Sequence, residues 1–274
     1  ICMCWPCGIG DASWLYAKLK HLPALLGREV RVSMPDAEPQ RGHQLLERLP
    51  GVTWAGYEPG WRNEDLFQCA MKPDVGLEAF APGSWLAVEV NRWLERGRKL
   101  ADWLPWLPTD YHFHIPTTEE EREVGAILLM GLPKPRLALY TSNRDKDRYP
   151  GWALWSAAEW VEAASPFASV ALLGAEYDRD RTEEVAALLR ARGVPVALCV
   201  GRSLGTALEV MRGCDAFLSY PSGIGILANV LRVPGVMLLP KMLSGLAVAY
   251  ADPEDLKSGA YRAWVTPRAE ELKE

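Results

Sequence analysis

A glycine-rich tetrapeptide near the N-terminus ends in an acid, Gly8-Ile9-Gly10-Asp11. A short apolar run precedes it and apolar residues at helical spacing follow it, so it joins a strand to a helix. Gly8 and Gly10 allow positive φ and close approach of the backbone, and the helix N-terminus offers free N–H groups to an anion. Asp11 is then either a plain N-terminal cap or a carboxylate that serves a bound ligand.

A second strand-to-helix turn has the sequence Ser219-Tyr220-Pro221-Ser222-Gly223-Ile224-Gly225-Ile226. Ser222 and Gly223 suit an N-cap over which a diphosphate could sit. The Gly-Lys-Ser/Thr ending of a Walker motif is absent. The competing interpretation is a capped helix in a parallel sheet, with no ligand.

Charged residues follow two further predicted strands. Arg144 and Lys146 lie in a loop whose cations could clamp phosphates, or which could be a solvated loop that neutralises itself with its aspartates. Gly174 ends the next strand, and Glu176 comes just after it. The Glu176 carboxylate could bind a ribose, or it could be an acid in the first turn of a helix.

The most basic window of the chain, residues 92–99, lies among tryptophans, which number twelve in all. Tryptophan rings fill protein cores, and they also form stacking platforms for sugars and bases. Trp93, Arg96 and Arg98 therefore could contact a ligand that carries phosphates, or could form a solvated helix face over a core.

No metal site is expected. Cys2, Cys4 and Cys7 have no second cluster nearby, and alternation within a strand favours buried thiols. His112 and His114 would share one face of a predicted strand, but a third ligand at recognisable spacing is missing.

The composition excludes several classes of protein. With 30 basic and 35 acidic residues the net charge is −5, which argues against a protein that coats nucleic acid by bulk electrostatics. No apolar stretch reaches the roughly 18 residues of a membrane span, and no basic region precedes the first apolar run as in a signal peptide. The six cysteines fit a reducing compartment, so we predict a cytoplasmic protein.

Strand and helix patterns alternate along the 274 residues, which predicts an α/β fold with parallel sheets. We expect strands at 2–6, 30–34, 51–55, 111–115, 136–140, 169–173, 195–200, 216–219 and 235–239. We expect helices at 11–26, 40–49, 86–103, 117–132, 153–165, 180–192, 204–213 and 222–231. The predicted parts are a Rossmann-like domain (1–115), a linker helix (116–135), a second Rossmann-like domain (136–250) and a tail (251–274).

The order of these motifs resembles the ADP-heptose:lipopolysaccharide heptosyltransferase family, the family 9-like GT-B glycosyltransferases. The resemblance rests on the Gly-Ile-Gly-Asp loop, the basic loop that ends in Tyr149-Pro150, the run Gly201-Arg202-Ser203-Leu204, and Ser222-Gly223. It is strongest from residue 136 to 240 and weak between 58 and 108.

The resemblance implies two Rossmann-like domains that face a central cleft, the first for the acceptor and the second for a nucleotide-diphosphate sugar. It implies an inverting, metal-independent glycosyltransferase that uses the nucleotide-sugar as co-substrate and needs no cofactor. By the resemblance Asp11 would be the general base, Lys146 would meet the diphosphate, and Ser222 and Gly223 would form the helix N-terminus that holds it. We also predict that Trp93, Arg96 and Arg98 contact the acceptor and that the tail packs back on the first domain. The full set of predicted donor contacts is Gly8, Gly10, Arg144, Lys146, Gly174, Glu176, Ser203, Leu204, Tyr220, Ser222, Gly223, Ile224 and Gly225.

The chain departs from the family pattern at two positions near the donor, where Pro221 replaces an Asp and Ile226 replaces a His. With its short first half, this leaves the sugar open, and it leaves the acceptor open between a glycan and a hydroxymethylated DNA base, as in compact phage-type relatives. The interpretation from another class is a non-catalytic module that binds a nucleotide or a sugar.

Overall fold

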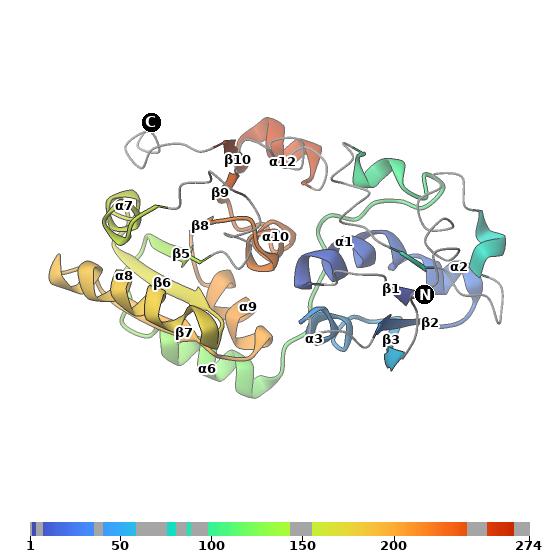
Figure 1. The fold of residues 1–274 in the computed structure, drawn as a ribbon, viewed down its shortest axis with the longest axis horizontal. Helices are drawn as coiled ribbons and strands as arrows, with labels where there is room; N and C mark the ends of the chain where they lie inside the picture. The colour runs from blue at the N-terminus through green and yellow to red at the C-terminus, as the bar shows by residue number, and fades with distance from the viewer. Residues whose placement is uncertain are drawn as a thin grey trace. The chain divides into compact units, whose positions relative to one another are not determined.

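The computed structural model describes residues 2–3, 8–35, 41–58, 76–80, 87–88, 98–142, 155–239 and 251–265. The chain divides into two compact units (Figure 1): unit 1 is Ile1–Ile115 with Val248–Asp252, and unit 2 is Pro116–Ala247 with Pro253–Glu274. Within the described ranges, no helix combines the length and the apolar character that a bilayer crossing requires.

Unit 2 is built on a parallel sheet of six strands in the order β10-β9-β8-β5-β6-β7. When these strands are numbered 1 to 6 along the chain and read from the β7 edge, their order is 3-2-1-4-5-6. This is the order of the doubly wound nucleotide-binding fold, whose winding reverses between its first and fourth strands. Those two strands are β5 and β8. The bounds are β5 (Arg136–Tyr140), β6 (Ser169–Gly174), β7 (Val196–Val200), β8 (Ala216–Ser219), β9 (Gly235–Leu239) and β10 (Tyr261–Val265).

Helices connect the successive strands of unit 2, and α6 (Glu119–Leu129) leads into β5. The connecting elements are α7 (Ala157–Ala163), the 3-10 helix η4 (Glu176–Asp178) with α8 (Arg179–Ala191), α9 (Leu204–Arg212), α10 (Gly223–Val230) and α12 (Pro253–Ser258). Local sequence signals fix where four of them begin. Thr118, Ser156, Ser203 and Ser222 cap α6, α7, α9 and α10, each accepting a hydrogen bond from the backbone N–H three residues on.

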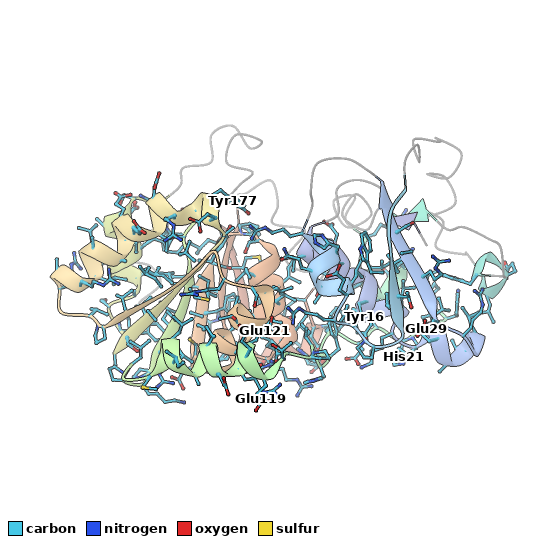
Figure 2. The ribbon with its side chains drawn as sticks, turned by 90° about the horizontal axis from the view of Figure 1, so that it is seen from below. Tyr16, His21, Glu29, Glu119, Glu121 and Tyr177 are labelled. Carbon is cyan, nitrogen blue, oxygen red and sulfur yellow. The ribbon has the colours of Figure 1, made fainter. Side chains whose placement is uncertain are left out.

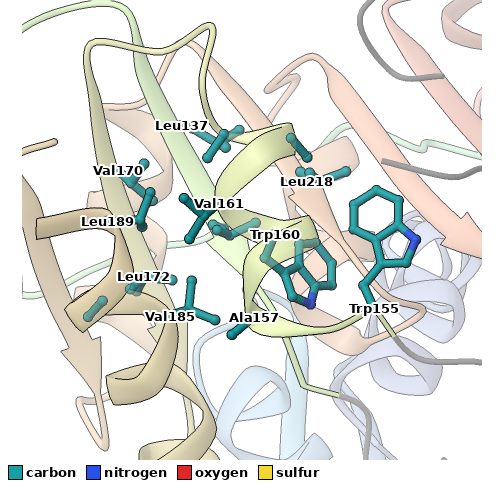
Figure 3. Close-up of a cluster of buried hydrophobic side chains, with 14 of the residues drawn as sticks. Leu137, Trp155, Ala157, Trp160, Val161, Val170, Leu172, Val185, Leu189 and Leu218 are labelled. Carbon is teal, nitrogen blue, oxygen red and sulfur yellow. The ribbon is translucent and has the colours of Figure 1, made fainter. Parts of the chain in front are cut away.

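Side chains from β5, β6, β8, α7 and α8 form a buried core on one face of this sheet (Figure 3). Alternate strand residues such as Leu137 and Leu139 supply it, because side chains of a strand alternate between the two faces. Trp160 is fully buried, and its ring meets those of Trp155 and Tyr220 edge-on with centroids 4.9 Å apart in both pairs. Trp155 and Trp160 therefore act as core filler.

The linker helix α6 lies beside α9 (Figure 1). Glycines allow this close approach, because a Cβ added at Gly125 would lie 2.6 Å from Glu209 Cβ, and one added at Gly205 would overlap the Glu121 carboxylate. The first turn of α6 is thereby fixed to the first turn of α9 within unit 2.

Unit 1 has a parallel sheet in the order β3-β2-β1-β4, which matches the first four strands of the doubly wound order. Its described strands are β1 (Cys2–Met3), β2 (Val30–Pro35), β3 (Val52–Glu58) and β4 (Ala87–Val88). Its described helices are α1 (Ile9–Leu19), α2 (Leu22–Leu26), α3 (Gly42–Leu46) and the 3-10 helices η1 (Leu77–Phe80) and η2 (Leu100–Asp102).

A lysine anchors α1 in unit 1. Lys18 is only 1% exposed, and its Nζ atom donates hydrogen bonds to the carbonyl oxygens of Ala101 (3.2 Å), Leu104 (3.4 Å) and Leu107 (3.0 Å). Burial lowers the pKa of Lys18 to about 8. Lys18 thus holds the segment 101–107 against the helix that begins at the Gly-Ile-Gly-Asp motif.

Two elements predicted in the first half are wrong. Residues 111–115 form no strand, and the Asp110 side chain instead accepts a hydrogen bond from the backbone N–H of His112 (3.1 Å), a local bond that competes with sheet pairing. The histidines at 112 and 114 therefore do not share a strand face. The helix expected over 86–103 is also wrong where that segment is described, because it contains β4 and η2.

The tail expected to pack back on residues 1–115 divides between the units. Asp252 belongs to unit 1, where a carboxylate oxygen lies 3.2 Å from His112 Nε2. Residues 261–265 instead form β10, which pairs in parallel with β9 and adds the sixth strand to unit 2. The sequence pattern predicted about five strands there and missed this one.

Candidate functional site

Two buried hydroxyl groups lie where the winding of the unit 2 sheet reverses, between β5 and β8. Tyr140 at the end of β5 pairs in register with Ser219 at the end of β8, and Thr141 follows Tyr140. The side-chain oxygens of Thr141 and Ser219 have no hydrogen-bond partner among the described residues. Ligands of open parallel sheets bind at the carboxyl ends of the strands at such a reversal.

The first turn of α10 adjoins this edge and has the geometry of an anion site. Ser222 Oγ accepts a hydrogen bond from the N–H of Gly225 (3.1 Å). Gly223 and Ile224 are the first helical residues, so their N–H groups have no acceptor within the helix. The predicted donor contacts Ser222, Gly223, Ile224 and Gly225 thus lie in one turn. Their contact with a donor stays a prediction.

Gly225 is packed against buried atoms of the two neighbouring strands. A Cβ added at Gly225 would lie 2.5 Å from Ser219 Oγ and 2.6 Å from Met237 Cε. We expect Gly225→Ala to lower the free energy of unfolding by about 1–3 kcal/mol, because overpacking forces the neighbours apart. Denaturant unfolding measures it. Removing Ser219 Oγ with Ser219→Ala in the same chain should restore part of the loss, and an unchanged free energy in Gly225→Ala would contradict this packing.

Tyr220, predicted as a donor contact, is a core residue. Its side chain is 2% exposed, and its hydroxyl accepts a hydrogen bond from the backbone N–H of Trp155. Burial raises the pKa of the Tyr220 phenol, which stays neutral. Tyr220 therefore leaves only its backbone to a ligand, and its ring fixes Trp155, the first described residue after the basic loop.

A pocket of about 360 Å³ opens at the carboxyl ends of β6 and β7. Glu176, the acid predicted to bind a ribose, lines it and is held in a two-fold ion pair. Arg179 Nε donates to Glu176 Oε1 (2.6 Å) and Arg179 Nη2 donates to Oε2 (2.8 Å), which lowers the pKa of Glu176. The lining consists of Glu176, Arg179, Leu198, Val200, Gly201 and Arg202.

Gly174, also predicted as a donor contact, shapes the turn that leads to Glu176. A Cβ added at Gly174 would lie 3.2 Å from Asp178 Cβ. The buried Asp178 carboxylate accepts hydrogen bonds from the N–H of Ala175 (2.8 Å) and the hydroxyl of Tyr140 (3.3 Å). The glycine thus leaves room for the acid that closes the turn.

Ser203 and Leu204 have structural contacts in unit 2. Ser203 Oγ caps α9 and donates to Glu121 Oε1 (2.7 Å) on the first turn of α6, where Figure 2 labels Glu121. The Leu204 side chain is buried. The pocket wall next to them is made instead by Gly201 and Arg202.

Asp11 lies in the first turn of α1, which follows β1 in unit 1. Its Oδ2 atom accepts a hydrogen bond from the N–H of Gly8 (2.8 Å), and its side chain is largely buried. Gly8 has an extended backbone with φ of −80°, so it does not use the positive φ that a glycine allows. In the unit 1 sheet the strand order reverses at β1, which lies between β2 and β4. Asp11 follows β1, so it lies at the position in unit 1 that corresponds to the reversal between β5 and β8 in unit 2.

Several predicted contacts lie outside the described residues, namely Arg144, Lys146, Trp93 and Arg96. Arg98 is exposed in unit 1, as an acceptor contact requires. Of the tryptophans near it, Trp103 is buried in the core, and Trp106 is 37% exposed with its ring edge-on to that of Phe80. Trp103 is therefore core filler.

The buried thiols of unit 2 have no catalytic character. Burial raises the pKa of both Cys199 and Cys214 to about 12, so neither forms a reactive thiolate near neutral pH.

Sequence reasoning missed Thr141, Ser219, Arg179 and Arg202. Thr141 and Ser219 end or follow predicted strands, which was the available signal for both. Arg202 stood inside the Gly-Arg-Ser-Leu run that carried the resemblance, and its side chain, with that of Arg179, lines the pocket.

No family model and no curated protein matches the chain, whereas solved structures do. A family 9 glycosyl transferase from Veillonella parvula matches with a TM-score of 0.66 at 14% identity, over 97% of this chain and 85% of its own. ADP-heptose lps heptosyltransferase II of E. coli matches at 0.61 and 15% identity, over 96% and 89%. E. coli heptosyltransferase WaaC, solved with ADP, matches at 0.54 and 14%, over 99% and 97%.

At these identities the similarity concerns the fold. It confirms the predicted α/β architecture, and it agrees with the parallel doubly wound sheet of unit 2. The chain therefore has the fold of the GT-B glycosyltransferases.

Proposed function

We propose that this chain is a glycosyltransferase that moves a sugar from a nucleotide-diphosphate donor to a hydroxyl group of an acceptor. One observation carries the proposal. The pocket with Glu176 and the anion-site geometry of α10 lie at the same carboxyl edge of one doubly wound sheet.

The spacing of strands supports one ligand that covers both places. The pocket lies at the ends of β6 and β7, and α10 follows β8, which is separated from β6 by β5. Neighbouring strands are about 4.8 Å apart, so the two places are roughly 10–14 Å apart along the edge. An extended nucleoside diphosphate spans this interval, with its ribose near Glu176 and its phosphates at Ser222.

The proposed reaction is an inverting displacement at the anomeric carbon. The acceptor oxygen forms a bond to that carbon, and the bond from the carbon to the donor phosphate oxygen breaks with its electron pair. Asp11 takes the proton of the acceptor hydroxyl as general base. The N-terminus of α10 and the cations Arg144 and Lys146 stabilise the charge of the leaving diphosphate. In this proposal they supply the positive charge that a metal ion would otherwise provide.

Ser222→Ala tests the phosphate end of the proposed donor site. We expect it to weaken the binding of whichever of ADP, CDP, GDP and UDP binds the parent chain most tightly about 3- to 10-fold, because it removes the side-chain oxygen that orders the first turn of α10. The affinity for the matching nucleoside, measured by calorimetry, should stay the same because it has no phosphate. An equal loss for nucleoside and diphosphate would contradict the placement of the phosphates.

The acceptor is to be identified by transfer to candidates of the two predicted kinds, a glycan and hydroxymethylated DNA. A DNA acceptor requires an affinity that falls as salt rises, because phosphate contacts release counterions. Product formation that salt leaves unchanged would favour the glycan.

A further inference from the structure

Arg202 is a cation of the unit 2 pocket whose side chain is available to a ligand. Its side chain is exposed at the end of β7 and lines the pocket, and among the described residues it has no ion-pair or hydrogen-bond partner. A guanidinium carries five donors in a fixed plane and accepts no hydrogen bond. Whatever Arg202 contacts in the pocket must therefore present acceptors.

The other charged groups at the pocket are paired with one another. Both oxygens of Glu176 accept hydrogen bonds from Arg179, and Arg179 Nη1 also lies 3.2 Å from Glu183 Oε1. Glu176 also lies against Gly201, where an added Cβ would overlap its Oε2 atom. Arg179 is thus engaged by two carboxylates, so the hydrogen-bond donors that remain open to a ligand are those of Arg202.

The position of Arg202 assigns it to the base end of a nucleotide. The inference rests on the proposed function, in which the phosphates lie at the first turn of α10 after β8. Arg202 follows β7, the edge strand three positions from β8 in the sheet. A diphosphate held at α10 directs the base, and not the phosphates, toward β7.

We propose that Arg202 selects a nucleotide whose base carries an exocyclic carbonyl, guanine or uracil, over the corresponding amino bases adenine and cytosine. Guanine presents O6 and N7 as two acceptors that fit an arginine fork, and uracil presents O4. Adenine and cytosine place an NH₂ group at that position, which would face the donors of Arg202. This chain would then differ from the E. coli enzyme WaaC that was solved with ADP.

Calorimetric binding of GDP, ADP, UDP and CDP to the whole chain tests the inference. We expect GDP to bind about 5- to 150-fold more tightly than ADP, and UDP to bind more tightly than CDP, since a good arginine–base pair discriminates by about that factor. Arg202→Gln should bring both ratios close to one, because an amide both donates and accepts. Arg190→Gln, at the far end of α8 from the pocket, is the matched control and should leave both ratios unchanged.

Three results would overturn the inference, and they are distinguishable. Ratios close to one in the parent chain, or ratios that Arg202→Gln does not alter, would overturn the base preference while nucleotide binding still supports the proposed function. Equal weakening of all four nucleotides in Arg202→Gln would place Arg202 at the shared ribose or phosphates. Absence of binding by all four would overturn the proposed donor site and the inference together.

Discussion

Asp11→Asn is expected to reduce sugar transfer by about 10²- to 10⁴-fold, because an amide cannot take the proton of the acceptor hydroxyl. The amide is nearly the same size as the carboxylate, and its oxygen can still accept the hydrogen bond from the Gly8 N–H (2.8 Å in the parent chain). The fold of α1 should therefore be kept. Initial rates of product formation at saturating donor measure the effect.

The matched control is Glu47→Gln, which removes an exposed carboxylate of unit 1 that follows α3. Glu47→Gln should transfer sugar at the parent rate. Asp11→Asn itself should bind nucleotide with unchanged affinity, because the proposed donor site lies in unit 2. Full transfer activity in Asp11→Asn would exclude Asp11 as the base.

Lys18 is expected to make the stability of unit 1 rise with pH in the alkaline range. Its pKa falls from the usual 10.5 to about 8 in the folded chain because of burial, opposed by the charge of Asp102. Between these values the unfolded chain binds more protons than the folded chain, so the free energy of unfolding increases from pH 8 to 10.5. The full change is on the order of 3 kcal/mol for a shift of this size.

Lys18→Met is the variant that isolates this effect. The parent chain also contains Tyr16 and Tyr111, whose pKa values burial raises, so their ionisation lowers stability above about pH 10. These tyrosines remain in Lys18→Met, so the difference in unfolding free energy between the two chains reports Lys18. We expect that difference to favour the parent increasingly from pH 8 to 10. A difference that does not vary with pH would show that the buried amine does not titrate in this range.

The strands and helices from residue 116 to 239 could be predicted from the sequence because their signals are local. The strands β5 and β6 are buried on both faces and have the sequences of short apolar runs, and hydroxyl side chains such as Thr118 and Ser222 mark where helices begin. Five regular strand–helix alternations then implied the parallel sheet. β10 was missed because a single strand in a charged segment gives little periodicity, and its pairing with β9 is a tertiary contact.

The candidate site was predicted less completely, because contacts between distant segments decide which side chains remain for a ligand. Tyr220 lies in a motif that suits a phosphate turn, yet its ring packs on Trp160, 60 residues earlier in the chain. Ser203 likewise bonds to Glu121 on the linker helix. Arg202 gave no distinct signal in the sequence. Its role follows from a contact between other residues, because Glu176 pairs with Arg179 and the guanidinium of Arg202 is then available to a ligand in the pocket.

Release of nucleotide from a panel of nucleotide-sugars, with and without candidate acceptors, tests most directly whether the chain is a glycosyltransferase. We expect the parent chain to release nucleotide from at least one donor in an acceptor-dependent manner, and Asp11→Asn to bind the same donor without releasing nucleotide. Tight binding of a nucleotide-sugar by the parent chain without release of nucleotide, across all donors and acceptors, would show that the chain is a binding module and not a glycosyltransferase.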